Sequence, residues 1–287
     1  WRGMGRHVGA EFTQKMKKSA LKPSSPSSAS SPWHWAVFGS LLGLLVATML
    51  FAPAAWLGKA LSLGSQGRVV LNEPSGTVWR GSGQLVLSGG AGSRDATTLP
   101  GRIHWRLKPT PTLKLRVLVD ADCCTTESIN MLIMPRLNGA IALLQPSQSS
   151  WPATLLTGLG APFNTIDLQA TLKLSTQTLT VEWLNKQLKL EGKAALDVID
   201  ASTRLSTLRP VGSYRLNFQG SQGAAAPSLN LETLSGSLLL SGNGQLTGNR
   251  WRFNGEASAA PGFEAALSNF LDILGRRVGP RSIITVG

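Results

Sequence analysis

Few residues in this chain have the types and spacing that catalysis requires. Its three histidines, His7, His34 and His104, lie in three separate segments. Nucleophilic catalysis needs a hydroxyl and an acid that converge on one imidazole, and no local pattern here brings such groups together. Asp120 and Asp122 stand close enough to pair, but next to a strand end such residues usually cap a turn. The sequence therefore predicts no catalytic residues and no enzyme.

The two cysteines, Cys123 and Cys124, are adjacent. A bond between neighbouring residues closes a ring too small to staple a fold, so we expect two buried thiols at a strand end. No CxxC pair with a nearby histidine completes a zinc site, and no glycine-rich loop precedes the Lys-Ser/Thr pair of a phosphate site. The sequence thus predicts neither a metal nor a cofactor.

The element that would position the rest of the chain is an uncharged stretch. Residues 33–57 contain no Asp, Glu, Lys or Arg. A helix of about 20 apolar residues crosses the roughly 30 Å hydrocarbon core of a bilayer. Trp33, Trp35 and Trp56 stand at the edges of the stretch, where indole rings favour the headgroup level. We predict one transmembrane signal-anchor helix over residues 33–57, with membrane lipid as its partner.

The charges ahead of this stretch predict its orientation. Lys and Arg are retained on the cytoplasmic side during insertion. The bases before Trp33 are Arg2, Arg6, Lys15, Lys17, Lys18 and Lys22, against the single acid Glu11. In a bacterium this predicts an inner-membrane protein with a cytoplasmic N-terminus and most of its chain in the periplasm. A cleaved signal peptide is the competing interpretation, since residues 52–54 resemble a cleavage site, but signal h-regions usually span about 7 to 15 residues.

Composition divides the rest of the chain. Residues 1–32 are rich in serine, proline and bases, and we predict a disordered cytoplasmic tail, with translation beginning at Met4 or Met16. After the span, a short linker from Gly58 to Gly67 leads into the sheet. Residues 58–287 together are predicted to be one periplasmic β domain.

Alternating apolar and polar residues between glycine-rich turns predict antiparallel strands with one buried and one wet face. The expected strands are 84–87, 102–107, 113–119, 165–174, 179–183, 188–190, 214–218 and 282–286. Helical patterns occur over residues 151–159 and, more strongly, over residues 263–274. The predicted fold is mainly β, a concave or elongated antiparallel sheet with one C-terminal helix.

The chain carries a formal net charge of +13, only part of which lies in the tail. A basic surface can serve solubility, or it can bind anionic lipid headgroups, lipopolysaccharide or an acidic protein. We exclude nucleic acid as a partner, because neither a basic helix nor interleaved aromatic residues accompany the charge.

Two segments of the expected sheet resemble one another. Residues 75–85 are SGTVWRGSGQL and residues 235–246 are SGSLLLSGNGQL, and a Trp-Arg pair follows each. This echo predicts either two similar β units at opposite ends of one sheet or two unrelated Gly-Ser turns. A tryptophan in a strand usually belongs to the core, so Trp79→Ala should destabilise the domain by about 3 to 5 kcal/mol if that ring is buried.

Three pieces of sequence carry a family resemblance. They are GTVWRG over residues 76–81, WRLKP over residues 105–109 and LDILGRR over residues 271–277, all behind one apolar stretch. In this order they resemble the type II secretion system protein N family, the general secretion pathway N component of Gram-negative bacteria, from about Trp33 onward. Members of these motifs are carried over as structural residues: Gly76, Thr77, Trp79, Gly81, Trp105 and Pro109.

The resemblance implies an accessory inner-membrane component. Its periplasmic β domain would dock on other secretion subunits, such as component C or the secretin, to support export of folded proteins. Proteins of this kind also look similar to periplasmic β-groove lipid carriers, which leaves a lipid-binding or lipid-transfer module as the alternative. A packed core would favour the scaffold, and an open apolar channel would favour the carrier.

Overall fold

The computed structural model describes residues 33–185, 187–221, 225–248 and 250–287. The predicted disordered tail over residues 1–32, with its two candidate start positions, lies outside them. Contacts divide the chain into two units, residues 1–46 and residues 47–287.

Helix α1 (Trp33–Leu50) has no buried residue and is long and apolar enough to cross a membrane. It ends before the predicted end at Leu57, because the chain takes an extended conformation at Pro53, with ψ of 146°. The segment predicted to be a linker is mostly a second helix, α2 (Ala54–Gly64), which packs on strand β1 (Val69–Gly76). Pro53 starts this helix well, since its missing N–H would be unpaired there in any case.

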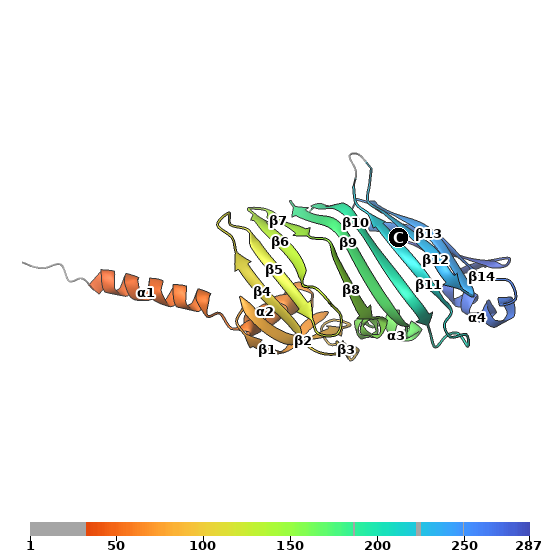
Figure 1. Ribbon diagram of the computed structural model, residues 1–287, viewed down its shortest axis with the longest axis horizontal. Helices are drawn as coiled ribbons and strands as arrows, with labels where there is room; N and C mark the ends of the chain where they lie inside the picture. Colours follow the sequence, from red (N-terminus) through yellow and green to blue (C-terminus); the bar gives the residue numbers. More distant parts are fainter. Residues whose placement is uncertain (1–32, 186, 222–224, 249) are drawn as a thin grey trace, which may run out of the picture. The chain divides into compact units, whose positions relative to one another are not determined.

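Within the described residues, the strands form one open antiparallel sheet (Figure 1). The remaining strands are β2 (Arg80–Ser88), β3 (Ala96–Thr98), β4 (Ile103–Pro109), β5 (Leu115–Ala121), β6 (Ile129–Arg136), β7 (Gly139–Leu144), β8 (Ser147–Pro152), β9 (Gln169–Leu184), β10 (Gln187–Ser202), β11 (Gly212–Gln219), β12 (Ser228–Gly236), β13 (Leu238–Thr247), β14 (Arg250–Ala259), β15 (Arg276–Val278) and β16 (Arg281–Val286). Most strands pair with their neighbours in sequence, so the sheet is a meander. The predicted mainly β fold is confirmed, including the C-terminal helix α4 (Glu264–Leu274).

The two margins of the sheet differ. Figure 1 shows α2, α3 (Phe163–Ile166) and α4 along one margin. The opposite margin includes the turns that follow strands β1, β4, β6 and β9. We call it the turn margin.

The register also separates two faces. On one face Trp105 lies opposite Val119, and on the other His104 lies opposite Asp120. The same alternation continues through β10 to β14, so one side of the sheet is apolar and the other is mainly polar. We call these the apolar face and the polar face.

Strand β9 corrects two predictions. The strand expected from residue 165 begins at Gln169, because the residues before it form α3. The strand then continues to Leu184, so two predicted strands are one. A register shift opposite Gly192 lets Leu174 and Leu179 both lie on the apolar face although their numbers differ in parity.

The predicted helical turn near residue 151 is also displaced. Trp151 belongs to β8, and the turn begins one residue after Pro152 as the 3-10 helix η1 (Ala153–Leu159). Pro152 is the last residue of the strand, where its fixed φ suits the start of a helical turn.

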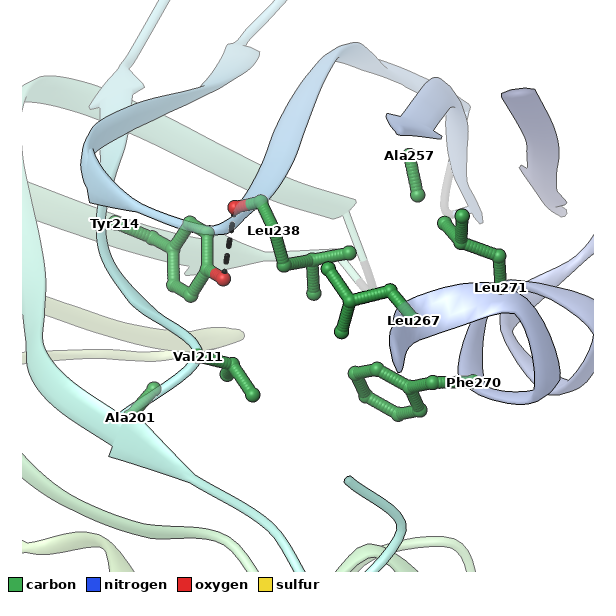
Figure 2. Packing of buried hydrophobic residues seen from close by; sticks show 8 residues of the cluster. All are labelled: Ala201, Val211, Tyr214, Leu238, Ala257, Leu267, Phe270 and Leu271. Carbon is green, nitrogen blue, oxygen red and sulfur yellow. Dashed lines mark hydrogen bonds between the residues drawn. The ribbon is translucent and has the colours of Figure 1, made fainter. Parts of the chain in front are cut away.

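Three separate clusters of buried residues lie on the apolar face. The largest contains Ala201, Val211, Tyr214, Leu238 and Ala257, closed by Leu267, Phe270 and Leu271 of α4 (Figure 2). These α4 residues recur every three or four positions, as the sequence predicts. The second cluster contains Leu99, Ala121, Cys124 and Leu155. The third contains Ala54, Leu71 and Trp105.

Cys123 and Cys124 form a disulfide with each other, so the predicted pair of free thiols is wrong. Cys124 is buried with 5% of its surface exposed, whereas Cys123 is exposed. The turn that carries them meets β8, because the Ser150 N–H donates to the Cys124 carbonyl at 2.7 Å. A ring between neighbours closes almost no loop, so this bond shapes a turn and does not staple distant strands.

Candidate functional site

The motif over residues 76–81 forms a tight hairpin at the start of the sheet. Gly76 ends β1 with φ of 87° and pairs with Gly81 of β2. A Cβ atom on Gly76 would lie 2.5 Å from the Arg80 carbonyl oxygen, so a side chain is excluded there. The Thr77 N–H donates to the Arg80 carbonyl at 2.9 Å, and the Thr77 hydroxyl accepts from the Arg80 N–H at 3.2 Å.

Gly81 makes room for Trp105 of the neighbouring strand β4. A Cβ atom on Gly81 would lie 2.6 Å from Cζ2 of this indole. Trp105 is 4% exposed and packs against Ala54 of α2 and Leu71 of β1. Its indole N–H donates to the Val78 carbonyl at 3.1 Å. The glycine pair and the ring beneath it therefore form one packed unit, which we call the tryptophan hairpin.

Trp79 lies on the outside of this unit and is only partly buried. Its indole N–H donates to the carbonyl of Met49, near the end of α1, at 2.8 Å. The Val78 N–H likewise donates to the Ala52 carbonyl at 2.8 Å. The condition attached to the Trp79→Ala prediction is not met, because the ring in the core is Trp105. Trp79 instead ties the hairpin to the end of the apolar helix.

The other predicted motif and anchor residues lie apart from the hairpin. Pro109 ends β4 opposite Leu115 and is exposed. Trp33 and Trp35 lie exposed in the first turn of α1, and Trp56 lies in α2, 51% exposed. The membrane-edge position of these three tryptophans stays a prediction.

A shallow hollow of about 450 Å³ opens beside the hairpin and is lined by polar groups including Ser75, Arg80 and His104. The imidazole Nε2 of His104 lies 3.2 Å from an Asp122 oxygen, and both side chains are about half exposed. Among the described residues, no hydroxyl hydrogen-bonds to this ring, and no group of three or more His, Cys, Asp or Glu is placed to hold a metal. The hollow offers hydrogen-bonding groups without a catalytic triad.

A strong ion pair lies farther along the polar face. Arg215 of β11 donates to both Asp197 oxygens of β10, at 2.6 and 2.8 Å. The hydrogen bond from Arg215 lowers the pKa of the Asp197 carboxyl, and the same bond raises the pKa of Arg215. The pair borders a second hollow of about 490 Å³. Sequence reasoning missed it, because only the register places these two residues opposite one another.

The second copy of the sequence echo lies at the turn between β12 and β13, and its first glycine faces a glycine of β11 that lies outside the echo. Gly236 ends β12 with φ of 129° and pairs with Gly212 of β11. A Cβ atom on Gly212 would lie 2.7 Å from the Tyr214 hydroxyl oxygen, and that hydroxyl donates to the Leu238 carbonyl at 3.1 Å (Figure 2). Burial raises the pKa of the Tyr214 hydroxyl, which keeps it a donor. We call this unit, the turn between β12 and β13 together with the adjoining part of β11, the tyrosine hairpin.

Sequence reasoning missed the structural role of Tyr214. The sequence offered one signal for this role, since Tyr214 is the only tyrosine of the chain and stands two residues after Gly212. The two hairpins lie far apart in the strand order, at β1 and β2 and at β11 to β13, and both interpretations of the echo stay predictions.

These features define a class of protein, an apolar N-terminal helix followed by an open antiparallel β-sheet that carries two glycine-aromatic hairpins far apart in the strand order. The model of the type II secretion system protein N family matches residues 67–284, and the chain belongs to this family. Membership makes it a type II secretion component for protein transport and implies contacts with other secretion subunits. The match does not favour the lipid-carrying alternative. Comparisons with curated proteins and with solved structures find no match.

Proposed function

We propose that this chain is an accessory inner-membrane component whose β-sheet body lies in the periplasm and docks on other secretion subunits. In this role it supports export of folded proteins across the outer membrane. The observation that carries the proposal is the family match, which spans nearly the whole sheet. Helix α1 supports the membrane anchor, and the bases ahead of it favour a cytoplasmic N-terminus. The proposed role needs no catalysis and no cofactor.

The turn margin offers the best docking surface for such a subunit. Leu137, in the turn between β6 and β7, is fully exposed, and Trp183 near the end of β9 is 45% exposed. Their turns adjoin, because the Asn185 N–H donates to the Asn138 carbonyl at 3.2 Å and the two side-chain amides hydrogen-bond at 3.1 Å. We call Leu137 and Trp183 the apolar turn pair. Exposed apolar side chains gathered in one place mark interaction sites, and tryptophan is enriched among residues that dominate binding.

The edges of the sheet are poorer docking surfaces. The β1 edge contains Pro74 and a register shift, both of which discourage addition of another strand. The β15 edge is three residues long. Short and irregular edge strands protect a sheet against pairing with foreign strands. A partner is therefore expected to bind side chains at the turn margin.

Photocrosslinking in cells tests this docking surface. The full chain would carry a photoreactive residue at position 137 or 183, in a strain that lacks its own N component. We expect adducts with another secretion subunit from both positions. Asn243, which is exposed on the polar face of β13, is the matched control position and should give none. Adducts from position 243 alone would show that the docking surface lies elsewhere.

An export assay tests the function itself. Trp183→Glu together with Leu137→Glu should lower export of a folded substrate at least tenfold, whereas Asn243→Glu should leave it unchanged. Circular dichroism of the purified variants checks that each is folded. Normal export in the strain without any N component would argue against a role in secretion, while normal export by the double variant would remove only the docking surface.

A further inference from the structure

Four cations gather where β2, β4 and β5 reach the turn margin. The register places Arg80 opposite Arg106 and Lys108 opposite Arg116. Arg106 and Lys108 are two residues apart in β4, so all four side chains share the polar face. Each of them is exposed. We call these four residues the basic patch.

The sheet itself neutralises little of this charge. Like charges directly opposite one another on neighbouring strands destabilise a sheet. Arg106 has one acidic partner, Asp120, at 3.4 Å. Among the described residues, no carboxylate lies within ion-pairing distance of Arg80, Lys108 or Arg116. The arrangement is unfavourable for folding alone and favours a negatively charged ligand.

The turn between Lys108 and Arg116 also exposes an apolar side chain. Leu113 is 86% exposed and has a left-handed backbone with φ of 55°. The turn is ordered by hydrogen bonds, since the Leu113 N–H donates to the Thr110 carbonyl at 3.1 Å and the Thr110 N–H donates to the Lys114 carbonyl at 2.8 Å. An exposed leucine flanked by cations suits a bilayer interface, where the apolar group enters the acyl boundary and the cations meet phosphates.

The basic patch lies beside the end of the apolar helix. Arg80 follows Trp79, whose indole hydrogen-bonds to the Met49 carbonyl near the end of α1. Adjacent strands are about 4.8 Å apart and same-face residues of a strand about 6.6 Å apart, so the patch lies within roughly 20 Å of that bond. Headgroups at that end of a membrane-spanning α1 would therefore be within reach of the patch.

From the uncompensated cations, the exposed leucine and this position, we propose that the basic patch and Leu113 bind the anionic phospholipid surface of the membrane that α1 crosses. The ligand groups are lipid phosphates, held by the four cations, while Leu113 enters the interface. An acidic protein could contact both the cations and the leucine, but the position beside the end of α1 favours lipid. The proposal rests on α1 as a membrane anchor and is independent of docking at the apolar turn pair.

Lipid crosslinking in nanodiscs tests the proposal on the full chain. A photoreactive residue at position 113 would be irradiated in discs of phosphatidylcholine alone or mixed equally with phosphatidylglycerol. We expect phosphatidylglycerol adducts at position 113, and at least fivefold fewer lipid adducts in the discs without anionic lipid. Position 137, exposed on the same margin but outside the patch, should give few adducts in either disc.

Matched variants test whether the charge of the basic patch causes the lipid adducts at position 113. Neutralising the patch with Arg80→Gln, Arg106→Gln, Lys108→Gln and Arg116→Gln should lower the adducts at least fivefold without lowering the melting temperature. The control neutralises four exposed cations elsewhere on the polar face, Lys173, Lys193, Arg250 and Arg252, and should leave the adducts unchanged. Equal adducts from both discs, or equal losses in both variant sets, would overturn the proposal.

Two further measurements distinguish lipid binding at the basic patch from protein docking at the apolar turn pair and from binding of free phosphate. Trp183→Glu should keep the lipid adducts at position 113, so a failed docking surface leaves this result intact. Inorganic phosphate in excess should compete only weakly with lipid. Complete loss of adducts at low phosphate would show a site for free phosphate and contradict membrane binding.

Discussion

The tryptophan hairpin and the tyrosine hairpin use similar parts in two distant regions of one sheet. Each has two facing glycines and a buried aromatic ring that donates a hydrogen bond to a hairpin carbonyl, Trp105 to Val78 and Tyr214 to Leu238. Their surroundings differ. The tryptophan end buries three residues in its cluster and is tied to the end of α1. The tyrosine end buries eight and is closed by α4.

This difference shows how two hairpins of similar parts can have different roles. A helix packs at each end, but α4 contributes three buried residues to its cluster whereas α2 contributes one, so the tyrosine end is stabilised more by its own packing. The tryptophan end has less to bury and instead carries the junction with α1 and the basic patch. We infer that the first end works at the membrane and that the second closes the fold. Four sets of substitutions can break or sharpen this comparison.

The largest expected effect comes from Trp105→Ala, which should lower the free energy of unfolding by about 3 to 5 kcal/mol through loss of a buried ring. Trp79→Ala should cost about 1 kcal/mol, because it removes one hydrogen bond from a partly buried residue. Urea unfolding of the full chain in detergent measures both. Hydrogen exchange should show that Trp105→Ala opens β1 to β5 first and leaves α4 protected, since the clusters are separate. A larger loss from Trp79→Ala would contradict the assignment of the core.

The glycines come next. A Cβ atom on Gly81 would lie 2.5 Å from the Ser75 carbonyl oxygen, and one on Gly212 would lie 2.8 Å from the Ser235 carbonyl oxygen. Gly81→Ala and Gly212→Ala should each destabilise the protein by about 1 to 3 kcal/mol, as overpacking does. Gly64→Ala in α2 is the control, because a Cβ there meets nothing within 4 Å. Melting temperatures of the three variants test this, and a neutral Gly81→Ala would show that the hairpin can relax.

Tyr214→Phe should have a smaller effect of about 1 kcal/mol, because it removes one buried hydrogen bond and leaves the Leu238 carbonyl without that donor. The ring itself stays and keeps filling the cluster. Chemical unfolding of the full chain gives the value. No change in stability would mean that the aromatic ring alone, and not its hydroxyl, defines the tyrosine hairpin.

The smallest effect is expected on the polar face beside the tyrosine hairpin, at the Asp197–Arg215 pair. The folded pKa of Asp197 is lowered from its ordinary value of 3.8, so the pair stabilises the fold above that pH and loses its contribution as pH falls below it. Asp197→Asn should therefore be less stable than the natural chain at neutral pH, and this difference should vanish in acid. The effect is modest because both side chains are partly exposed. Melting curves of both proteins against pH measure it, and a difference that persisted in acid would show that packing is responsible.

Much of the architecture could be predicted from the sequence. Alternation in β4 and β5 predicts a sheet because successive side chains point to opposite faces, and the three- and four-residue spacing in α4 predicts its buried side. The family resemblance, carried by motifs around Trp79 and Trp105, is confirmed by the match over residues 67–284.

What could not be predicted depends on register and local geometry. Trp79 and Trp105 both precede an arginine, and only strand pairing shows that Gly81 makes room for the second ring. The early end of α1 depends on Pro53 starting a new helix. The bond between Cys123 and Cys124 depends on the shape of one turn. In each case the decisive partner is set by the folded backbone, which a single sequence constrains weakly.

The central claim is that α1 anchors the chain in the inner membrane and that the β-sheet lies on the periplasmic side, where it meets other secretion subunits. A dual reporter of alkaline phosphatase and green fluorescent protein, fused after Gly287 and expressed in a Gram-negative bacterium, measures this most directly. We predict an active phosphatase and no fluorescence, because the phosphatase folds in the periplasm and this fluorescent protein does not when exported unfolded. A fluorescent fusion with inactive phosphatase would place the sheet in the cytoplasm and contradict the account.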